Sequence, residues 1–241
     1  MEIKIYKDAE SIGRAAAGMF AAKIIENPKC VLGMATGSTP LPTYNALIEL
    51  YNINVLDFRM VKTFNLDEYV GIGREHGQSY YRFMFDNLFS KVNISPKNVH
   101  VPNPVSKNFE DDCAAYDAAI EKSGGIDLQI LGIGHNGHIA FNEPSKVFPF
   151  GTHIVNLTKS TIEANQRFFK NIDEVPKKAM TMGIGSIMKA REIIIIATGK
   201  EKAEAVKAMI KGNVDPMCPA SVLQLHHKVT VFLDKEAASL L

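Results

Sequence analysis

Two hydrophobic patterns alternate along this chain. Continuous apolar runs at residues 30–35, 127–134 and 192–199 are typical of strands that are buried on both faces of a parallel sheet. Between these runs, apolar residues recur every three or four positions, as they do on the buried face of an amphipathic helix. The chain therefore alternates strand and helix from end to end.

The expected elements follow from this alternation. Strands are predicted at 2–8, 30–35, 60–65, 127–134, 192–199 and 228–234, and helices at 9–27, 40–51, 78–92, 109–120 and 200–211. Strands that alternate with helices predict an α/β fold with a doubly wound, mostly parallel sheet. In such sheets ligands bind beyond the carboxyl ends of the strands, so the loops that follow strands are the candidate site.

Domain organisation follows from the evenness of the pattern. No linker-like or low-complexity stretch interrupts it, so residues 1–241 are expected to form a single domain. Residues 142–175 form an insertion between two strands, and we expect a mobile flap within it.

Composition excludes several classes of function. The 241 residues are 46% hydrophobic and carry a net charge of +1, which argues against a nucleic-acid partner. No apolar run approaches the roughly 20 residues that a membrane span needs, so no membrane partner is expected. Cys30, Cys113 and Cys218 lie far apart and are interpreted as reduced packing residues of a cytoplasmic protein. The number of subunits stays open, a homo-oligomer included.

The first candidate loop is ATGSTP, residues 35–40. Gly37 allows a sharp turn, and Ser38 and Thr39 place hydroxyls beside the free N–H groups of the next helix, a typical phosphate site. The alternative is that Ser38 or Thr39 only caps the helix. A similar segment, ATGKEK at 197–202, repeats the first three residues of ATGSTP. It brings Lys202 to the start of another helix, where it could approach an anion or be solvated.

The second loop is FNLDEYVG, residues 64–71, in which Asp67 and Glu68 directly follow a strand. A carboxylate there could cap a helix or form a turn. If Asp67 faces the ligand crevice, partial burial would raise its pKa and suit it to accept a proton from carbon.

The third loop is GIGHNGHIAFNEP, residues 132–144. Gly137 and its neighbouring glycines allow a tight turn with inward-pointing N–H groups. His138 titrates near neutrality, and Glu143 could orient it for acid–base chemistry. A zinc site is the alternative for the histidines and Glu143, but their spacing fits no standard ligand motif, so no metal is expected.

These motifs resemble a known enzyme family. The segments MATGSTP, FNLDEYVG, SYYRFM, GIGHNGHIAFNEP, NQRFF and VPKKAMTMGIGSI are similar to those of glucosamine-6-phosphate deaminases, of the glucosamine/galactosamine-6-phosphate isomerase family, over residues 3–234. The resemblance implies a Rossmann-like three-layer fold and no cofactor. The implied reaction converts glucosamine-6-phosphate and water to fructose-6-phosphate and ammonia.

The resemblance also assigns roles to residues. It implies that Asp67 abstracts the C2 proton, that His138 assists ring opening, and that Glu143 is the carboxylate paired with His138. Asn136 stands where some members carry aspartate, so we expect His138 to be less biased toward its charged form. The substrate-binding residues implied are Gly37, Ser38, Thr39, Gly137, Arg167 and Lys202.

One departure concerns regulation. Allosterically activated members carry Arg and Lys just after the NEP segment, where this chain has His153 and Val155. We therefore expect little or no activation by N-acetylglucosamine-6-phosphate, so that the ligand leaves the rate curve unchanged.

Three other functions compete with the deaminase. A 6-phosphogluconolactonase shares the fold and the glycine loop, but the lactonases carry a different ending to the His motif. A simple aldose–ketose isomerase would use the same base and release no ammonia. A sugar-phosphate sensor would leave Asp67, His138 and Glu143 without a role.

Overall fold

A large parallel sheet forms the centre of the fold. The computed structural model describes residues 1–166 and 169–241. Among them, the strands of the large sheet are β1 Glu2–Tyr6, β2 Val31–Met34, β3 Lys62–Asn65, β5 Val99–His100, β6 Leu128–Gly132, β9 Ile193–Ala197 and β10 Val229–Asp234. They lie in the order β1-β10-β9-β6-β2-β3-β5, and each neighbouring pair is parallel.

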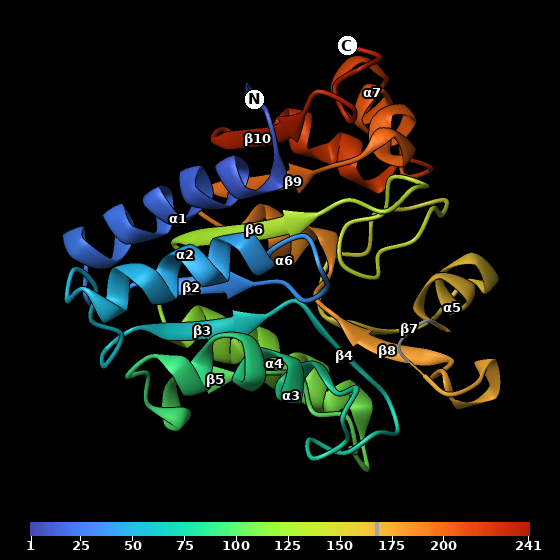
Figure 1. The fold of residues 1–241 in the computed structure, drawn as a ribbon. Helices are drawn as coiled ribbons and strands as arrows, with labels where there is room; N and C mark the ends of the chain where they lie inside the picture. The colour runs from blue at the N-terminus through green and yellow to red at the C-terminus, as the bar shows by residue number, and fades with distance from the viewer. Residues whose placement is uncertain (167–168) are drawn as a thin grey trace.

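Helices cover both faces of this sheet. They are α1 Ala9–Glu26, α2 Leu41–Asn52, α3 Tyr80–Asn87, α4 Phe109–Lys122, α5 Lys159–Asn165, α6 Ile184–Met188 and α7 Ala203–Lys211. In Figure 1, α1 and α2 lie on the near face, and α4 and α6 lie on the far face. The predicted fold, a three-layer, doubly wound, mostly parallel α/β sheet, is confirmed.

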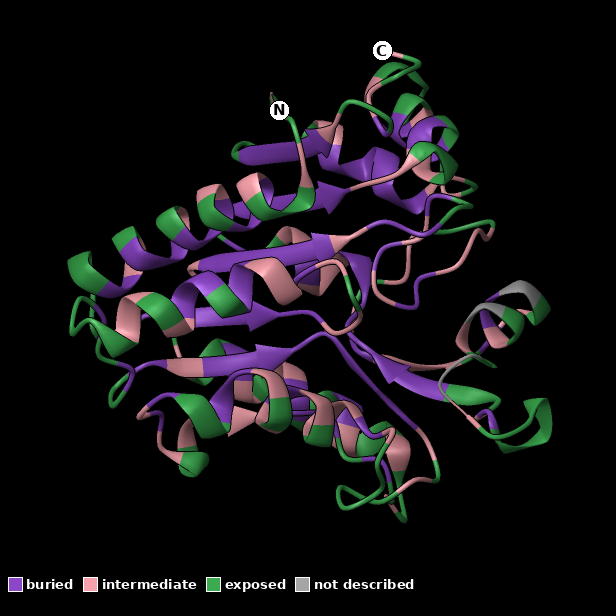
Figure 2. Cartoon of the chain, viewed as in Figure 1, coloured by how far each residue is buried: buried purple, intermediate pink, exposed green. Residues whose placement is uncertain are grey.

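Burial explains why these segments form strands and helices. The β9 residues Ile193 to Ile196 are at most 1% exposed, because helices cover the sheet on both sides. Figure 2 shows the central strands β2, β6 and β9 buried along most of their length, while α1 and α2 are buried on one side only. The α1 helix begins after Asp8, whose carboxylate accepts a hydrogen bond from the Ser11 N–H at 2.7 Å.

One predicted helix is wrong in its extent. The sequence predicts a helix over 78–92, but α3 ends at Asn87, and a 3-10 turn follows at Phe89–Lys91. Leu88 leaves helical geometry, with φ −144° and ψ −58°, yet its side chain stays 1% exposed. The apolar spacing continues past the end of the helix because the turn still packs on the core.

A second, small sheet was not predicted. It is antiparallel, in the order β4-β8-β7, with β4 at Asp67–Tyr69, β7 at His153–Asn156 and β8 at Lys178–Thr181. A separate apolar cluster packs with it, built on Tyr69, Phe141, Leu157 and Ala179. Segment 142–175 thus contributes β7 and α5, and motion of a flap within it stays a prediction.

The strand order locates a crevice. From β2 the chain moves outward to β3 and β5, and then returns to β6 on the other side of β2. The loops after β2 and β6 therefore diverge at this switch point, which is where doubly wound sheets bind ligands.

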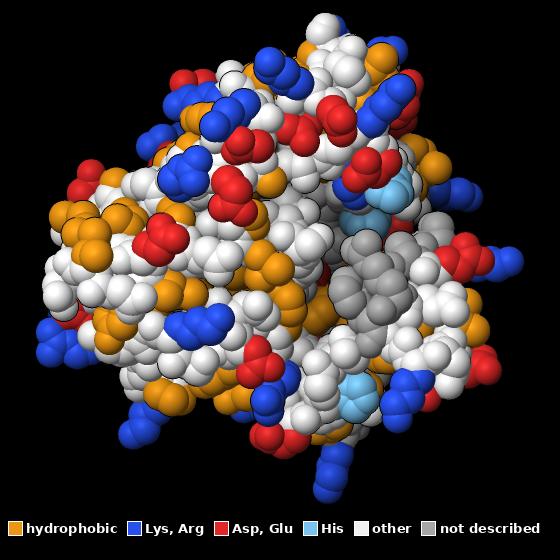
Figure 3. Space-filling model, in the orientation of Figure 1, with side chains coloured by type: hydrophobic (Ala, Val, Ile, Leu, Met, Phe, Trp, Pro, Cys, Tyr) orange, Lys and Arg blue, Asp and Glu red, His pale blue; other side chains and the backbone are white. Residues whose placement is uncertain are grey.

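The distribution of charge on the surface and the length of the helices are relevant to nucleic-acid and membrane partners. On the face seen in Figure 3, Lys and Arg are interspersed with Asp and Glu, and no broad patch of one sign forms. Within residues 1–166 and 169–241, no helix is long and apolar enough to cross a membrane.

Candidate active site

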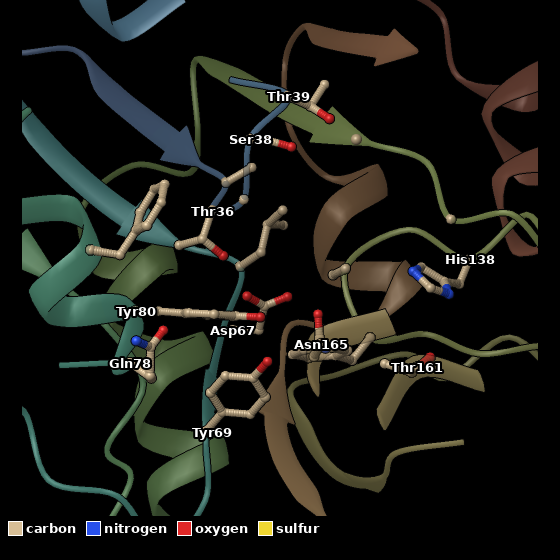
Figure 4. A pocket seen from close by; sticks show the side chains of 18 of the residues that line it. Thr36, Ser38, Thr39, Asp67, Tyr69, Gln78, Tyr80, His138, Thr161 and Asn165 are labelled. Carbon is tan, nitrogen blue, oxygen red and sulfur yellow. The ribbon is translucent and has the colours of Figure 1, made fainter. Parts of the chain in front are cut away.

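A cavity of about 650 Å³ lies at the switch point. Its described walls come from the loops after β2 and β6, from the β3–β4 junction, from the start of α3 and from α5. Figure 4 shows Ser38 and Thr39 at one end, Asp67 with Tyr69 and Tyr80 in the middle, and His138 on another wall. The three loops predicted from the sequence therefore do line one cavity.

The loop after β2 is built as a turn into a helix. Gly37 has φ +94°, a conformation that glycine adopts without strain. Pro40 stands at the cap position of α2, and no side chain caps this helix, so the capping alternative for Ser38 and Thr39 is wrong. Lys202, from the 3-10 turn at Lys200–Lys202, lines the same cavity. Phosphate binding by this group stays a prediction.

Asp67 is almost completely buried in the cavity wall. Its residue is 7% exposed, and burial, together with the neighbouring charge of Glu68, raises the pKa of Asp67 to about 8. The hydroxyls of Tyr69 and Tyr80 lie near it, and burial raises the pKa of Tyr69 to about 12, so that both phenols stay protonated. Asp67 is thus a carboxylate of unusually high basicity in a water-poor setting.

His138 and Glu143 form an ion-pair geometry on a different wall. The Nδ1 atom of His138 lies 3.3 Å from Oε2 of Glu143, and the same oxygen accepts a hydrogen bond from the Asn136 amide at 2.6 Å. The Glu143 Oε1 atom accepts a hydrogen bond from the Thr161 hydroxyl at 2.5 Å. Because Glu143 occupies Nδ1, the His138 Nε2 is left to exchange protons.

These contacts outweigh the effect of burial on Glu143. Burial alone would raise its pKa, but the hydrogen bond and charge of His138, with the Thr161 hydroxyl and the Asn136 amide, lower it to about 2. Glu143 is therefore ionised across the physiological range.

Gly137 shapes the turn that carries Asn136 and His138. Its φ is +83°, and a Cβ atom there would lie 2.7 Å from the Cys218 Sγ atom. The Gly137 carbonyl also accepts a hydrogen bond from the Ala220 N–H at 2.8 Å. Only glycine meets both the conformational and the steric requirement.

We expect Gly137→Ala to lower the free energy of unfolding by about 2 kcal/mol and to reduce kcat/KM, because it strains the turn that holds His138. Urea denaturation and steady-state kinetics measure both effects. Gly73→Ala is the matched control, since a Cβ atom there meets nothing within 4 Å and its φ is not positive. Adding Cys218→Ala should recover only the steric part. Equal free energies of unfolding for Gly137→Ala and Gly73→Ala would contradict the expectation.

The sequence missed several residues of the site. Thr161 hydrogen-bonds Glu143, and Tyr69, Tyr80 and Asn165 line the cavity beside Asp67. The signal for Tyr80 was present, since it begins a helix that follows the Asp67 loop, but nothing in the local pattern singles out Thr161. The predicted phosphate ligand Arg167 lies outside the described residues.

No metal centre is apparent in the part of the chain that the structure describes. There, no three His, Cys, Asp or Glu side chains are grouped so that they could hold a metal ion. His226 is buried, and its Nε2 atom lies 2.8 Å from the Ala190 carbonyl oxygen, a contact typical of a structural histidine.

Comparison with known proteins identifies the family. The model of the family described as glucosamine-6-phosphate isomerases/6-phosphogluconolactonase matches residues 7–232. The chain belongs to this family. Among the curated members, glucosamine-6-phosphate deaminase from Thermoanaerobacter sp. (strain X514) is 54% identical, and the alignment covers 100% of this chain and 95% of that protein. The corresponding deaminase of Clostridium perfringens (strain ATCC 13124) is 51% identical over the full length of both chains.

Solved structures of the family agree with this fold. A monomeric glucosamine-6-phosphate deaminase superposes with a TM-score of 0.97 at 43% identity, and all of both chains is covered. The 6-phosphogluconolactonase of Thermotoga maritima gives a TM-score of 0.74 at 22% identity over 97% of this chain and 99% of that one. At that identity the lactonase comparison supports the shared fold alone.

Proposed function

We propose that this family member is a glucosamine-6-phosphate deaminase, which converts glucosamine-6-phosphate and water to fructose-6-phosphate and ammonia. The observation that carries the proposal is that Asp67 and His138 line one cavity, with Glu143 in contact with His138 behind the cavity wall. Full-length identity of 54% to a curated deaminase adds support. Asp67 supplies a base for the C2 proton, and the histidine pair supplies the acid–base group for ring opening.

Substrate binding begins at the phosphate. The N–H groups and hydroxyls of the Gly37–Ser38–Thr39 turn, at the start of α2, bind its oxygens, and Lys202 and Arg167 contribute positive charge. Gly137 contributes to substrate binding through the turn that it shapes for Asn136 and His138, since its own N–H donates to the Gly134 carbonyl at 3.0 Å and its carbonyl accepts from the Ala220 N–H at 2.8 Å. The phosphate lies away from the reacting carbons, so its binding energy holds C2 against Asp67 without taking part in the chemistry.

Ring opening is the first chemical step. His138 takes the proton of the C1 hydroxyl and returns a proton to the ring oxygen, which breaks the C1–O5 bond and gives the open-chain aldehyde. Glu143 stabilises the imidazolium that forms between these two transfers, and Asn136 holds Glu143 in place through its amide.

Isomerisation and loss of ammonia follow. Asp67 removes the C2 proton, and the electron pair of the C2–H bond forms a C1–C2 double bond. The π pair of the C1 carbonyl moves to its oxygen, which takes a proton from solvent, and this gives an enolamine. A proton delivered to C1 converts the enolamine to a 2-iminium species. Water adds to C2, and ammonia leaves with the original nitrogen, which gives the ketose. Every step is a proton transfer, an addition or an elimination, so the proposal calls for no redox cofactor.

The proposal needs no second subunit, because each residue that it uses comes from one chain, whether or not a homo-oligomer forms. We also propose a cytoplasmic location. Cys30, Cys113 and Cys218 are free thiols in the structure, as expected in a reducing compartment.

The test is to incubate the protein with glucosamine-6-phosphate and to measure ammonia and fructose-6-phosphate in parallel. We expect one ammonia for each ketose formed, because both arise from the same 2-iminium species. Glucose-6-phosphate and 6-phosphogluconolactone are run as alternative substrates. Ketose from glucose-6-phosphate without ammonia would point to a simple isomerase, and rapid lactone hydrolysis would point to a lactonase.

A further inference from the structure

The proposed reaction leaves the neighbour of Asp67 without a role. Glu68 is the middle residue of β4 and is 0% exposed. Successive strand residues point to opposite sides, and accordingly Asp67 lines the cavity whereas Glu68 does not. Complete burial of a carboxylate costs free energy unless its oxygens accept hydrogen bonds. The hydrogen bonds of Glu68 therefore indicate what it does.

Two of its three hydrogen bonds are with the start of α3. The Oε1 atom of Glu68 accepts hydrogen bonds from the backbone N–H groups of Tyr69 and Tyr80, both at 2.9 Å, and Oε2 accepts one from Tyr81 at 3.0 Å. Tyr80 and Tyr81 are the first two residues of the helix, whose free N–H groups and dipole favour a negative charge. Glu68 therefore acts as a helix cap supplied by a distant strand.

This cap joins two walls of the cavity. On one side, β4 carries Asp67 and pairs with β8, where Glu68 lies opposite Met180. On the other side, Tyr80 begins α3 and extends its phenol toward Asp67 (Figure 4), with its ring stacked on Phe141 at a centroid distance of 6.1 Å. One buried carboxylate thus sets how the base and the phenol face each other.

The two adjacent carboxylates differ in their hydrogen bonding. Glu68 accepts three N–H groups, whereas no described residue donates a hydrogen bond to Asp67. Burial raises the pKa of Glu68 above its ordinary value, and those N–H groups and the charge of Arg74 limit this rise. The other titratable groups facing the pair are the phenols of Tyr69, Tyr80 and Tyr116, which are neutral. The three N–H donors favour a negative charge on Glu68, whereas burial favours the protonated form of Asp67.

We propose that Glu68 is a positioning residue for the reaction: bound to the start of α3, it holds Asp67 against Tyr80 and keeps a fixed negative charge behind the base. The inference rests on the proposed function, in which Asp67 is that base. The fixed charge makes Asp67 a stronger base once it is ionised, and a base matched to the working pH transfers protons best.

Glu68→Gln removes the charge and keeps the side-chain shape. We expect the acidic limb of the pH profile of kcat/KM to move down by about one pH unit, because Asp67 then ionises more easily. We also expect kcat to fall by about 10-fold, with KM nearly unchanged, because Asp67 becomes a weaker base. Glu68→Asp keeps the charge, but its side chain is too short to bond α3 in the same way. We expect the acidic limb of the pH profile to stay at the wild-type pH, while Tm falls.

Ser79→Ala is the matched control for damage to the helix. The Ser79 hydroxyl accepts a hydrogen bond from the Arg82 N–H at 3.1 Å at the same end of α3, and it carries no charge. We expect this variant to lower Tm and to leave the acidic limb in place. Glu68→Gln could behave like Ser79→Ala, with a lower Tm but with the acidic limb of the pH profile and kcat unchanged. In that case Glu68 only caps the helix, and the proposal is overturned.

A second measurement separates this inference from the proposed function. NMR of the protein labelled with ¹³C at aspartate carboxyls follows the titration of Asp67 without any substrate, and an Asp67→Asn sample assigns its signal. A lower titration midpoint in Glu68→Gln, or in Glu68→Ala if the glutamine variant does not fold, supports the role of Glu68. An unchanged midpoint overturns it. Absence of ammonia release by the wild type would defeat the proposed function alone.

Discussion

Replacing Asp67 with asparagine is expected to lower kcat for ammonia release by about 10³-fold, while KM for glucosamine-6-phosphate changes little. The amide cannot accept the C2 proton, but it occupies the same volume in a wall where the residue is 7% exposed. Steady-state assays of both products measure the loss. Exchange of the C2 proton with deuterated water should disappear together with turnover, because both depend on the same proton abstraction.

The same variant should be more stable than the wild type at alkaline pH. The folded-state pKa of Asp67 is raised to about 8, above its ordinary value of 3.8, so ionisation opposes folding as the pH rises through this interval. Asparagine avoids that cost, which grows between pH 4 and pH 8 to roughly 6 kcal/mol, at about 1.4 kcal/mol for each unit of the pKa rise, and vanishes below pH 4.

Thermal or urea unfolding at several pH values checks the stability difference. A variant that loses activity and is also less stable than the wild type at pH 9 would show that Asp67 has a structural role in place of the proposed one. Retention of turnover within a few-fold of wild type would eliminate Asp67 as the base.

Glu143→Gln is expected to lower kcat/KM by about 10²-fold, because the imidazolium of His138 loses its negative partner during ring opening. Thr161→Val removes one hydrogen bond to Glu143 and keeps its charge, so it should cost about 10-fold. Kinetics started from the open-chain aldehyde form provide the control, since substrate that is already open should rescue most of the loss. A defect that persists with open-chain substrate would place Glu143 in a later step.

The effect of Glu143→Gln on stability should also depend on pH. The pKa of Glu143 is lowered in the folded state to about 2, so its ionised form stabilises the fold above its ordinary pKa of 4.5. This stabilisation is lost as the pH falls toward 2. The difference in Tm between wild type and variant should therefore be present at pH 7 and shrink in acid.

The long elements were predictable because each carries its own pattern. The α1 helix begins after the capping residue Asp8 and buries the expected stripe, including Ile12 and Phe20, and the continuous apolar run of β9 is buried on both faces. The short antiparallel sheet carries no such pattern. Its β4 strand has three residues, and it becomes a strand only through pairing with β8, more than 100 residues later.

The residues of the candidate site likewise divide into those that the sequence could predict and those that it could not. Asp67, His138 and Gly37 could be singled out because each follows a buried strand, and parallel strands bring such loops to one edge of the sheet. Thr161 and the function of Glu68 could not, because their partners are chosen by packing and not by spacing. The sequence allowed a carboxylate of this loop to be a helix cap or a turn former. Glu68 is a helix cap, but the helix begins 12 residues further along the chain, which the local pattern does not indicate.

The sequence by itself determined the alternation of strand and helix, the parallel sheet and the loops that carry the chemistry. It did so because burial on one or both faces of an element requires apolar residues at regular spacings along the chain. The tertiary structure alone decided which side chains meet. It placed Glu143 between His138 and Thr161, and it bound the buried carboxylate of Glu68, next to Asp67, to the start of α3. Basicity depends on burial and on neighbouring charges in space, and neither quantity is written in the local pattern of residues.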